Sequence, residues 1–334
     1  NIMTNKKFPQ KLWTALTALI LLAMLASGCA SAPTPKSYTV GVIVEINWLS
    51  PIFDNFKTTM TELGYVEGEN ITYLYNPEVG PDQAAFDAEA QRLMEQKVDI
   101  FFTVGTMTTK AAKKAVEGTD IPVVFTPVIN PIEEGVVASI ANPGGNVTGV
   151  QIVDHSPKGL EWALKIAPQT KFVYMPYNPA DTISMMIVNG GMLEAISQLG
   201  VELAPSEVTS VDEMLARVDT LPEDTIIFLL SPLSSLEGGL EKLSQLAKER
   251  GVPVFSTNRE IGASPFPVAN YTVTMDGEAE QGANMVDRIL KGQKPADMPV
   301  ETAEYFLDID LKSAEAYGIQ IPDEIVKQAN VIIR

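Results

Sequence analysis

The chain has 334 residues, of which 46% are hydrophobic, and it carries 42 acidic against 24 basic side chains. This length is enough for two domains of ordinary size, and the hydrophobic content excludes a disordered chain. The formal net charge of −18 gives a surface that repels nucleic acid. We therefore expect a folded protein with real cores and no nucleic-acid partner.

Residues 1–29 have the layout of a secretory signal peptide. Three lysines give a basic start, and the apolar run at 12–26 is too short for a comfortable membrane span. The run ends at Ala26-Ser27-Gly28-Cys29, which resembles a bacterial lipobox, although the usual leucine stands one position early, at Leu25.

Cys29 is the only cysteine of the chain. One interpretation is a chance cysteine within a signal peptide; the other is cleavage before Cys29 and lipidation of its thiol, with acyl chains that anchor the protein to a membrane. Residues 30–37, with two prolines, would then form a tether. Removal of the three lysines would leave 21 basic against 42 acidic residues, a net charge of −21.

Apolar strands alternate with amphipathic helices in the first half of the mature chain. This alternation predicts a parallel, doubly wound sheet. We expect strands at 40–44, 70–75, 99–104 and 121–125, and helices at 53–63, 84–96 and 107–116.

The stretch DIPVVFTPVINPIEEGVVASIANPGGNVTGVQ, residues 120–151, marks the end of this unit. After the strand at 121–125, Pro131 and the acidic residues behind it predict a helix at 133–140. The turn residues at 142–146 precede an apolar strand at 147–153. We expect the chain to cross to a second lobe here.

The second half repeats the same order of elements. We expect strands at 172–175, 201–203, 225–230 and 252–255, and helices at 185–199, 212–218 and 236–250. Leu63-Gly64 corresponds to Leu199-Gly200 at an offset of 136 residues, and Ile121-Pro122-Val123 corresponds to Val252-Pro253-Val254 at an offset of 131. Two similar offsets indicate two lobes of one architecture.

The tail returns to both lobes. It predicts an apolar strand within 263–275, a helix at 278–290, an extended segment at 299–307 and a helix at 311–317. Crossings near Gln151, Tyr271 and Tyr305 give a three-crossing hinge. The predicted lobes comprise residues 38–150 with about 272–305, and residues 151–271 with about 306–334.

Several motifs in this order carry a resemblance. They are IPVVF-x-P-V-x-x-P, PGGNVTGV, Leu63-Gly64-Tyr65, Tyr177-Asn178-Pro179 and LKGQKP at 290–295. Together they resemble the solute-binding proteins of ABC transporters, in the family that includes tryptophan- and tyrosine-binding lipoproteins. The resemblance implies a type I periplasmic-binding-protein fold, capture of a small solute between two lobes, and delivery to a permease and an ATPase, without a cofactor and outside the cytoplasm.

The sequence departs from this family where an amine would bind. Members that bind amino acids often have Asp before Pro in one turn and Asp-Asn in another; here the turns read Asn130-Pro131 and Ser231-Pro232-Leu233-Ser234. A buried ammonium needs a nearby anion. Asp181 remains and could serve, so the sequence predicts a polar solute with an acceptor end and at most one cationic group.

Candidate ligand-binding residues follow the carboxyl ends of the predicted strands, where ligands bind in open α/β sheets. Each has a structural alternative: Trp48 could stack on a ligand or plug its lobe, Thr106 could contact a ligand or cap a helix, and Asn178 could form a structural turn. The full set is Trp48, Thr106, Thr108, Asn130, Asn178, Asp181, Ser184, Ser231 and Ser234, with Asn258 as a weaker candidate.

Enzyme chemistry has little support in the sequence. His155 is the only histidine, so no second histidine or internal cysteine could share a metal with it. The acid pair Glu133 and Glu134 is adjacent on a predicted helix, so its side chains would point about 100° apart. A solute receptor of an ABC importer and a ligand-sensing lipoprotein that signals to a membrane partner both remain compatible with the sequence.

Overall fold

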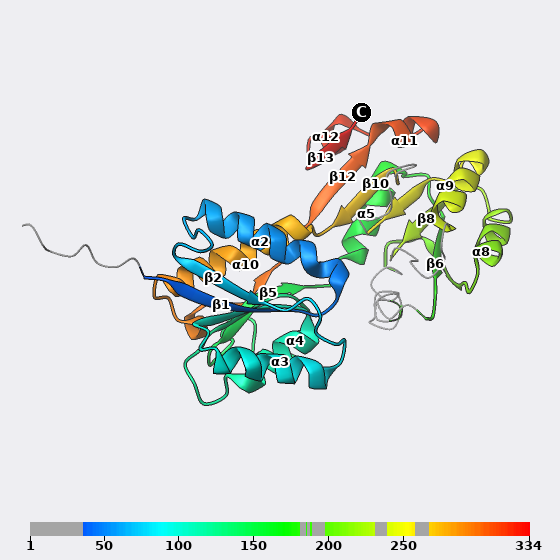
Figure 1. Cartoon of the computed structure of the whole chain (residues 1–334). Helices are drawn as coiled ribbons and strands as arrows, with labels where there is room; N and C mark the ends of the chain where they lie inside the picture. Colours follow the sequence, from blue (N-terminus) through cyan, green and yellow to red (C-terminus); the bar gives the residue numbers. More distant parts are fainter. Residues whose placement is uncertain (1–35, 181–184, 186–187, 189–197, 231–238, 258–266) are drawn as a thin grey trace, which may run out of the picture.

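The computed structural model describes residues 36–180, 185, 188, 198–230, 239–257 and 267–334. Two sheets form the centres of two lobes, and Figure 1 shows the lobes connected by chain segments that lie between them. Both sheets have helices on both faces, as the alternating pattern of the sequence predicts. Within these ranges no helix is both long and apolar enough to span a membrane.

The first lobe contains a six-stranded parallel sheet in the order β11-β5-β4-β3-β1-β2. In that order the strands span Glu301–Thr302, Val147–Ile152, Val123–Ile129, Ile100–Val104, Tyr38–Val44 and Ile71–Tyr75. The predicted strands of the first half are thereby confirmed within a few residues at their ends.

The second lobe contains a seven-stranded sheet in the order β13-β12-β10-β9-β8-β6-β7. The strands span Val331–Ile333, Phe306–Asp310, Ala269–Thr272, Val254–Ser256, Thr225–Leu229, Phe172–Tyr177 and Glu202–Glu207. The order 10-9-8-6-7 repeats the order 5-4-3-1-2 of the first sheet, which confirms the predicted repeat. One pair, β10 with β12, is antiparallel.

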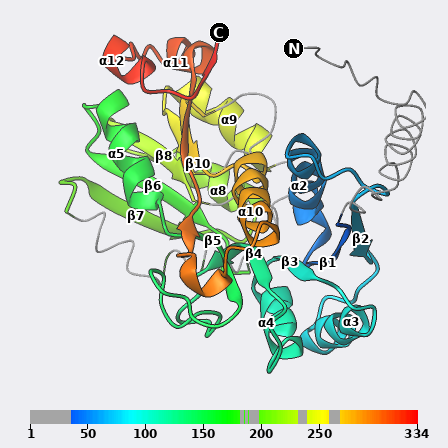
Figure 2. The same cartoon turned by 90° about the vertical axis from the view of Figure 1, so that its left-hand side faces the viewer.

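Helices cover both faces of each sheet, and Figure 2 shows α2 beside α10 over the first one. In the first lobe the helices are η1 (Asn47–Leu49), α2 (Ser50–Glu62), α3 (Gln83–Glu95), α4 (Thr106–Ala115), α10 (Met275–Leu290) and η2 (Pro295–Asp297). In the second lobe they are α5 (Ser156–Ile166), α8 (Val211–Val218), α9 (Gly239–Arg250), α11 (Leu311–Ala316) and α12 (Asp323–Val326).

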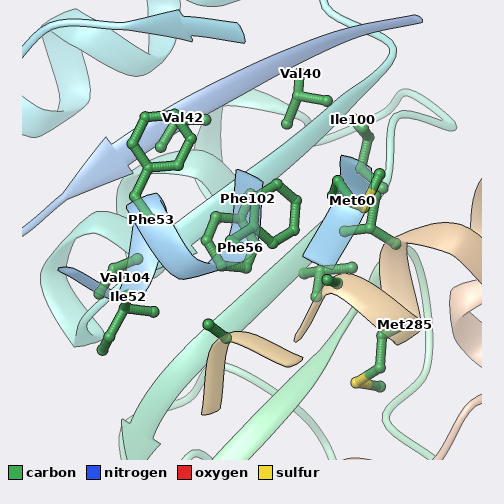
Figure 3. Close-up of a cluster of buried hydrophobic side chains, with 14 of the residues drawn as sticks. Val40, Val42, Ile52, Phe53, Phe56, Met60, Ile100, Phe102, Val104 and Met285 are labelled. Carbon is green, nitrogen blue, oxygen red and sulfur yellow. The ribbon is translucent and has the colours of Figure 1, made fainter. Parts of the chain in front are cut away.

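The two faces of the first sheet carry separate cores because successive strand residues point to opposite faces. Phe102 of β3 points to the α2 and α10 face, where its ring stacks on Phe56 with 3.8 Å between centroids. Figure 3 shows this pair among aliphatic side chains from β1, with Met285 of α10 nearby. Phe101 points to the other face and packs with α3 and α4. The second sheet is built alike, with α5 on one face and α8 and α9 on the other.

The chain passes between the sheets three times. It leaves β5 after Ile152 and enters α5, leaves β10 after Thr272 and enters α10, and leaves β11 after Thr302 and enters β12. This is the fold of two doubly wound lobes with a three-crossing hinge that the sequence predicts.

Two segments differ from the prediction. The predicted helix at 133–140 is wrong: residues 131–135 form successive turns, and Gly135 adopts a φ of +68° that ends any helical run. The N–H groups of Val136 and Val137 both donate to the Pro131 carbonyl. Helix α5 was not predicted. Most of the predicted helix at 185–199 lies outside the described residues.

Candidate functional site

Strands β5, β4, β3 and β1 are parallel neighbours, so their carboxyl ends meet at one edge of the first sheet, which we call the first-sheet edge. The chain leaves β5 and β11 for the second lobe at this edge, and it leaves the second sheet at the carboxyl end of β10. Both sheets thus present carboxyl ends towards the crossing segments. Ligands in open α/β sheets bind outside such edges.

Glu45 lies at the first-sheet edge, directly after β1. Its carboxylate accepts a hydrogen bond of 2.8 Å from the backbone N–H of Met107, in the first turn of α4. Glu45 is half-buried. Burial raises the pKa of its carboxyl, and the N–H groups at the start of α4 offset part of that rise. The first N–H groups of α4 therefore already interact with a carboxylate of the protein itself, that of Glu45.

Gly105 makes room for this carboxylate. It precedes α4 with a φ of +107°, and a Cβ built there would lie 2.3 Å from the Glu45 Oε2. Any larger residue at this position would have to displace the Glu45 side chain. Because Gly105 is the N-terminal cap residue of α4, Thr106 is not its cap.

The two threonines predicted to contact a ligand differ in their positions. Thr106 is half-buried at the first position of α4. Thr108 is fully buried, and its hydroxyl donates to the carbonyls of Val104 and Gly105 at 3.0 and 3.1 Å. The Thr108 side chain is thus engaged inside the lobe and does not reach the first-sheet edge.

Four large apolar side chains are exposed at the first-sheet edge. Ile46 and Trp48 follow β1, Ile132 follows β4 and Val153 follows β5. Trp48 is 52% exposed, whereas its neighbour Leu49 is buried, so Leu49 and not Trp48 fills the lobe. We call Glu45 and Thr106 the polar centre of this edge. By strand order Ile132 and Val153 lie on its β4 and β5 side, and Ile46 and Trp48 follow Glu45 along the chain, so apolar residues border the polar centre.

Asn130 ends β4 at the same edge. It is exposed and adopts a φ of +50°, a conformation that asparagine tolerates better than most residues. Its carbonyl accepts from the Glu134 N–H in the turns that follow. Glu134 forms an ion pair with Lys110 of α4.

In the second lobe, Asn178 follows β6 and is buried. Its Oδ1 accepts from the Ala180 N–H at 2.9 Å, which is the structural turn that the sequence offers as an alternative. Cys29, Asp181, Ser184, Ser231, Ser234 and Asn258 lie outside the described residues.

The three crossings meet in an aromatic cluster of His155, Tyr271 and Tyr305. The Tyr305 ring lies 4.5 Å from the His155 ring and 5.7 Å from the Tyr271 ring, centroid to centroid. Its hydroxyl donates to the Val153 carbonyl at 2.8 Å and accepts from the Val153 N–H at 3.0 Å. Burial holds the pKa of the His155 ring below its ordinary value. The described ranges contain no cluster of three potential metal ligands.

This geometry defines a class of protein: two doubly wound α/β lobes connected by a three-crossing hinge, with the strand ends of both sheets directed towards the crossings. A sequence model of the ABC transporter substrate binding protein family matches residues 37–333, and the chain belongs to that family. Its role is therefore solute binding outside the cytoplasm, without catalysis.

Relatives agree with this assignment. The tyrosine-binding protein of Clostridioides difficile strain R20291 is 22% identical over 318 residues, which cover 88% of each chain. A ligand-free, open substrate-binding protein with adhesive properties from Clostridium difficile is similar with a TM-score of 0.75 and 22% identity, covering 89% of this chain and 99% of that one. A Streptococcus pneumonia ABC domain in complex with L-Trp is similar with a TM-score of 0.65 and 22% identity, covering 89% and 100%.

Proposed function

We propose that this protein captures a small polar or amino-acid-like solute between its two lobes and delivers it to the permease and ATPase of an ABC importer. The observation that carries the proposal is the first-sheet edge, where a polar centre with apolar borders lies on the side of the crossings. Relatives whose names refer to tyrosine and L-Trp support a solute of amino-acid type.

In this proposal the lobes comprise residues 38–150 with about 272–305, and residues 151–271 with about 306–334. Trp48, Thr106 and Asn130 contribute from the first lobe. Thr108 is left out, because its hydroxyl bonds to the backbone inside the lobe. From the second lobe the proposed site takes Asn178, Asp181, Ser184, Ser231 and Ser234.

The proposed site of action is the outer face of a membrane. Residues 1–29 act as a signal peptide, Cys29 receives the lipid, and residues 30–37 form the tether that separates the lobes from the bilayer. The lipobox-like sequence and the short apolar run before it support this anchor.

Ligand-driven closure tests the proposal. The purified protein is titrated with each of the twenty L-amino acids by calorimetry, and small-angle scattering is recorded with and without each solute that binds. We expect the radius of gyration to fall at saturation, because solute bridges the lobes and biases the hinge towards closure. An unchanged scattering profile at saturation contradicts the clamshell mechanism, and a chain that binds none of these solutes contradicts the amino-acid-like ligand.

A further inference from the structure

The start of α4 is not open to an anionic group of a solute. The Met107 N–H donates to Glu45, and the Thr106 and Thr108 N–H groups also favour the charge of this carboxylate. A second carboxylate at this position would meet a like charge instead of free donors. The polar centre of the first-sheet edge is thus an acceptor site that lacks a cation.

No lysine or arginine pairs with Glu45 in the part of the chain that the structure describes. The cation whose charge acts on Glu45 is Lys110, and its ammonium is paired with Glu134. Burial raises the pKa of Glu45, which means that its surroundings disfavour the charged carboxylate relative to water. A cation bound next to this carboxylate would stabilise its negative charge and form a charge-assisted hydrogen bond with it.

The borders of the polar centre favour a solute with an apolar body. Ile46 and Trp48 lie on the β1 side, and Ile132 and Val153 lie on the β4 and β5 side. All four are exposed. Burial of apolar surface against a solute contributes about 25 cal/mol for each Å² removed from water. A solute with an apolar body that covers these side chains would therefore bind more tightly.

We propose that Glu45 binds the ammonium group of the solute, and that Trp48 and Ile132 cover an apolar body next to that ammonium. The inference rests on the proposed function and deepens it by naming the recognition residue. In this proposal the acid that is missing from the turn at Asn130-Pro131 is supplied from the end of β1.

The test compares wild type with Glu45→Gln and with Glu69→Gln as a matched control. The glutamine at 45 keeps an oxygen that accepts the Met107 N–H but removes the charge. Glu69 is exposed beside the start of β2, at the opposite edge of the same sheet. The probes are the twenty L-amino acids, each with its decarboxylated amine and its desamino acid, measured by calorimetry.

We expect Glu45→Gln to weaken binding of the best amino acid and of its amine by about ten- to 100-fold, the range of a charge-assisted hydrogen bond. The desamino acid should change by less than about twofold, within the scatter of surface substitutions, and Glu69→Gln should leave all three unchanged. Trp48→Ala should weaken binding of apolar amino acids and leave glycine unaffected.

Equal affinities of wild type and Glu45→Gln for amine-bearing probes would overturn the inference while leaving the solute-binding function intact. The same holds for a wild type that prefers the desamino acid. A wild type that binds no probe, and whose scattering profile never changes, would instead overturn the proposed function.

Discussion

Glu278 lies in the first turn of α10 with 4% of its surface exposed. Its Oε1 atom has no hydrogen-bond partner among the described residues. Burial alone raises the pKa of this carboxyl to about 8. Glu278 is therefore protonated and neutral in the folded protein at neutral pH.

This buried acid predicts a pH dependence of stability. Between the ordinary value of 4.5 and about 8, the folded state holds a proton that the unfolded state has lost, so stability falls as the pH rises through this window. The unfolding free energy of wild type should fall by up to about 1.4 kcal/mol per pH unit more steeply than that of Glu278→Gln. Urea unfolding from pH 5 to 8.5 measures both slopes.

Glu280→Gln is the matched control, since Glu280 is exposed on the same helix. It should keep the wild-type slope. Identical slopes for wild type and Glu278→Gln would show that the Glu278 carboxyl titrates normally.

Gly105→Ala should lower the unfolding free energy by more than an alanine substitution at another glycine with a positive φ. The added Cβ would collide with Glu45, whereas a Cβ at Gly64, with a φ of +96°, meets nothing within 4 Å. Backbone strain of about 1–3 kcal/mol is common to both alanine variants. We expect Gly105→Ala to lower the unfolding free energy further than Gly64→Ala and to weaken amine binding as well. Equal losses in the two variants would mean that the Glu45 side chain moves aside freely.

At the residue scale the sequence predicts only part of the site. Trp48, Thr106 and Asn130 all lie at the first-sheet edge, because strand ends can be read from apolar runs. Glu45 was missed because one exposed-looking acid after a strand carries no signal of its own. Its partner Met107 is 62 residues away, and only the pairing of β1 with β3 brings them together.

Neighbouring phenylalanines on β3 belong to different cores. Phe101→Ala and Phe102→Ala should each lower the unfolding free energy by about 3–5 kcal/mol, since both rings are fully buried. Hydrogen exchange should then separate them: Phe102→Ala loosens α2 and α10, and Phe101→Ala loosens α3 and α4. The same helices losing protection in both variants would contradict the two-faced packing.

Elements with continuous apolar runs were predicted well, whereas one predicted helix is absent and one helix, α5, was not predicted. The segment at 133–140 has a proline and acids in the right places for a helix start, but Gly135 at a positive φ closes a turn instead. Helix α5 has Pro157 and Gly159 within its first turns, which hide it from a propensity argument. Gly159 is needed there because a Cβ would lie 2.9 Å from Thr257 Cγ2.

At the scale of the whole molecule, the first prediction concerns the proposed lipid anchor at Cys29. Cys29→Ala should release the protein from membranes or leave an uncleaved precursor, because no thiol remains to carry the lipid. Cell fractionation with detection of acylation measures this. A Cys29→Ala variant that still fractionates as a mature, acylated membrane protein would exclude the lipoprotein proposal.

Helix α10 reaches the first lobe only after the chain has passed through most of the second. Three of its hydrogen bonds to the first lobe, from Asn55 to Asp276, from Tyr65 to Asp287 and from Tyr38 to the Leu290 carbonyl, span 221, 222 and 252 residues. Contacts this distant in sequence form slowly, because loop closure must precede them. As the chain elongates, the face around Phe56 and Phe102 stays uncovered until α10 arrives. The half of the protein that is made first must therefore wait for the last quarter of the chain, and until then this aromatic face is open to aggregation.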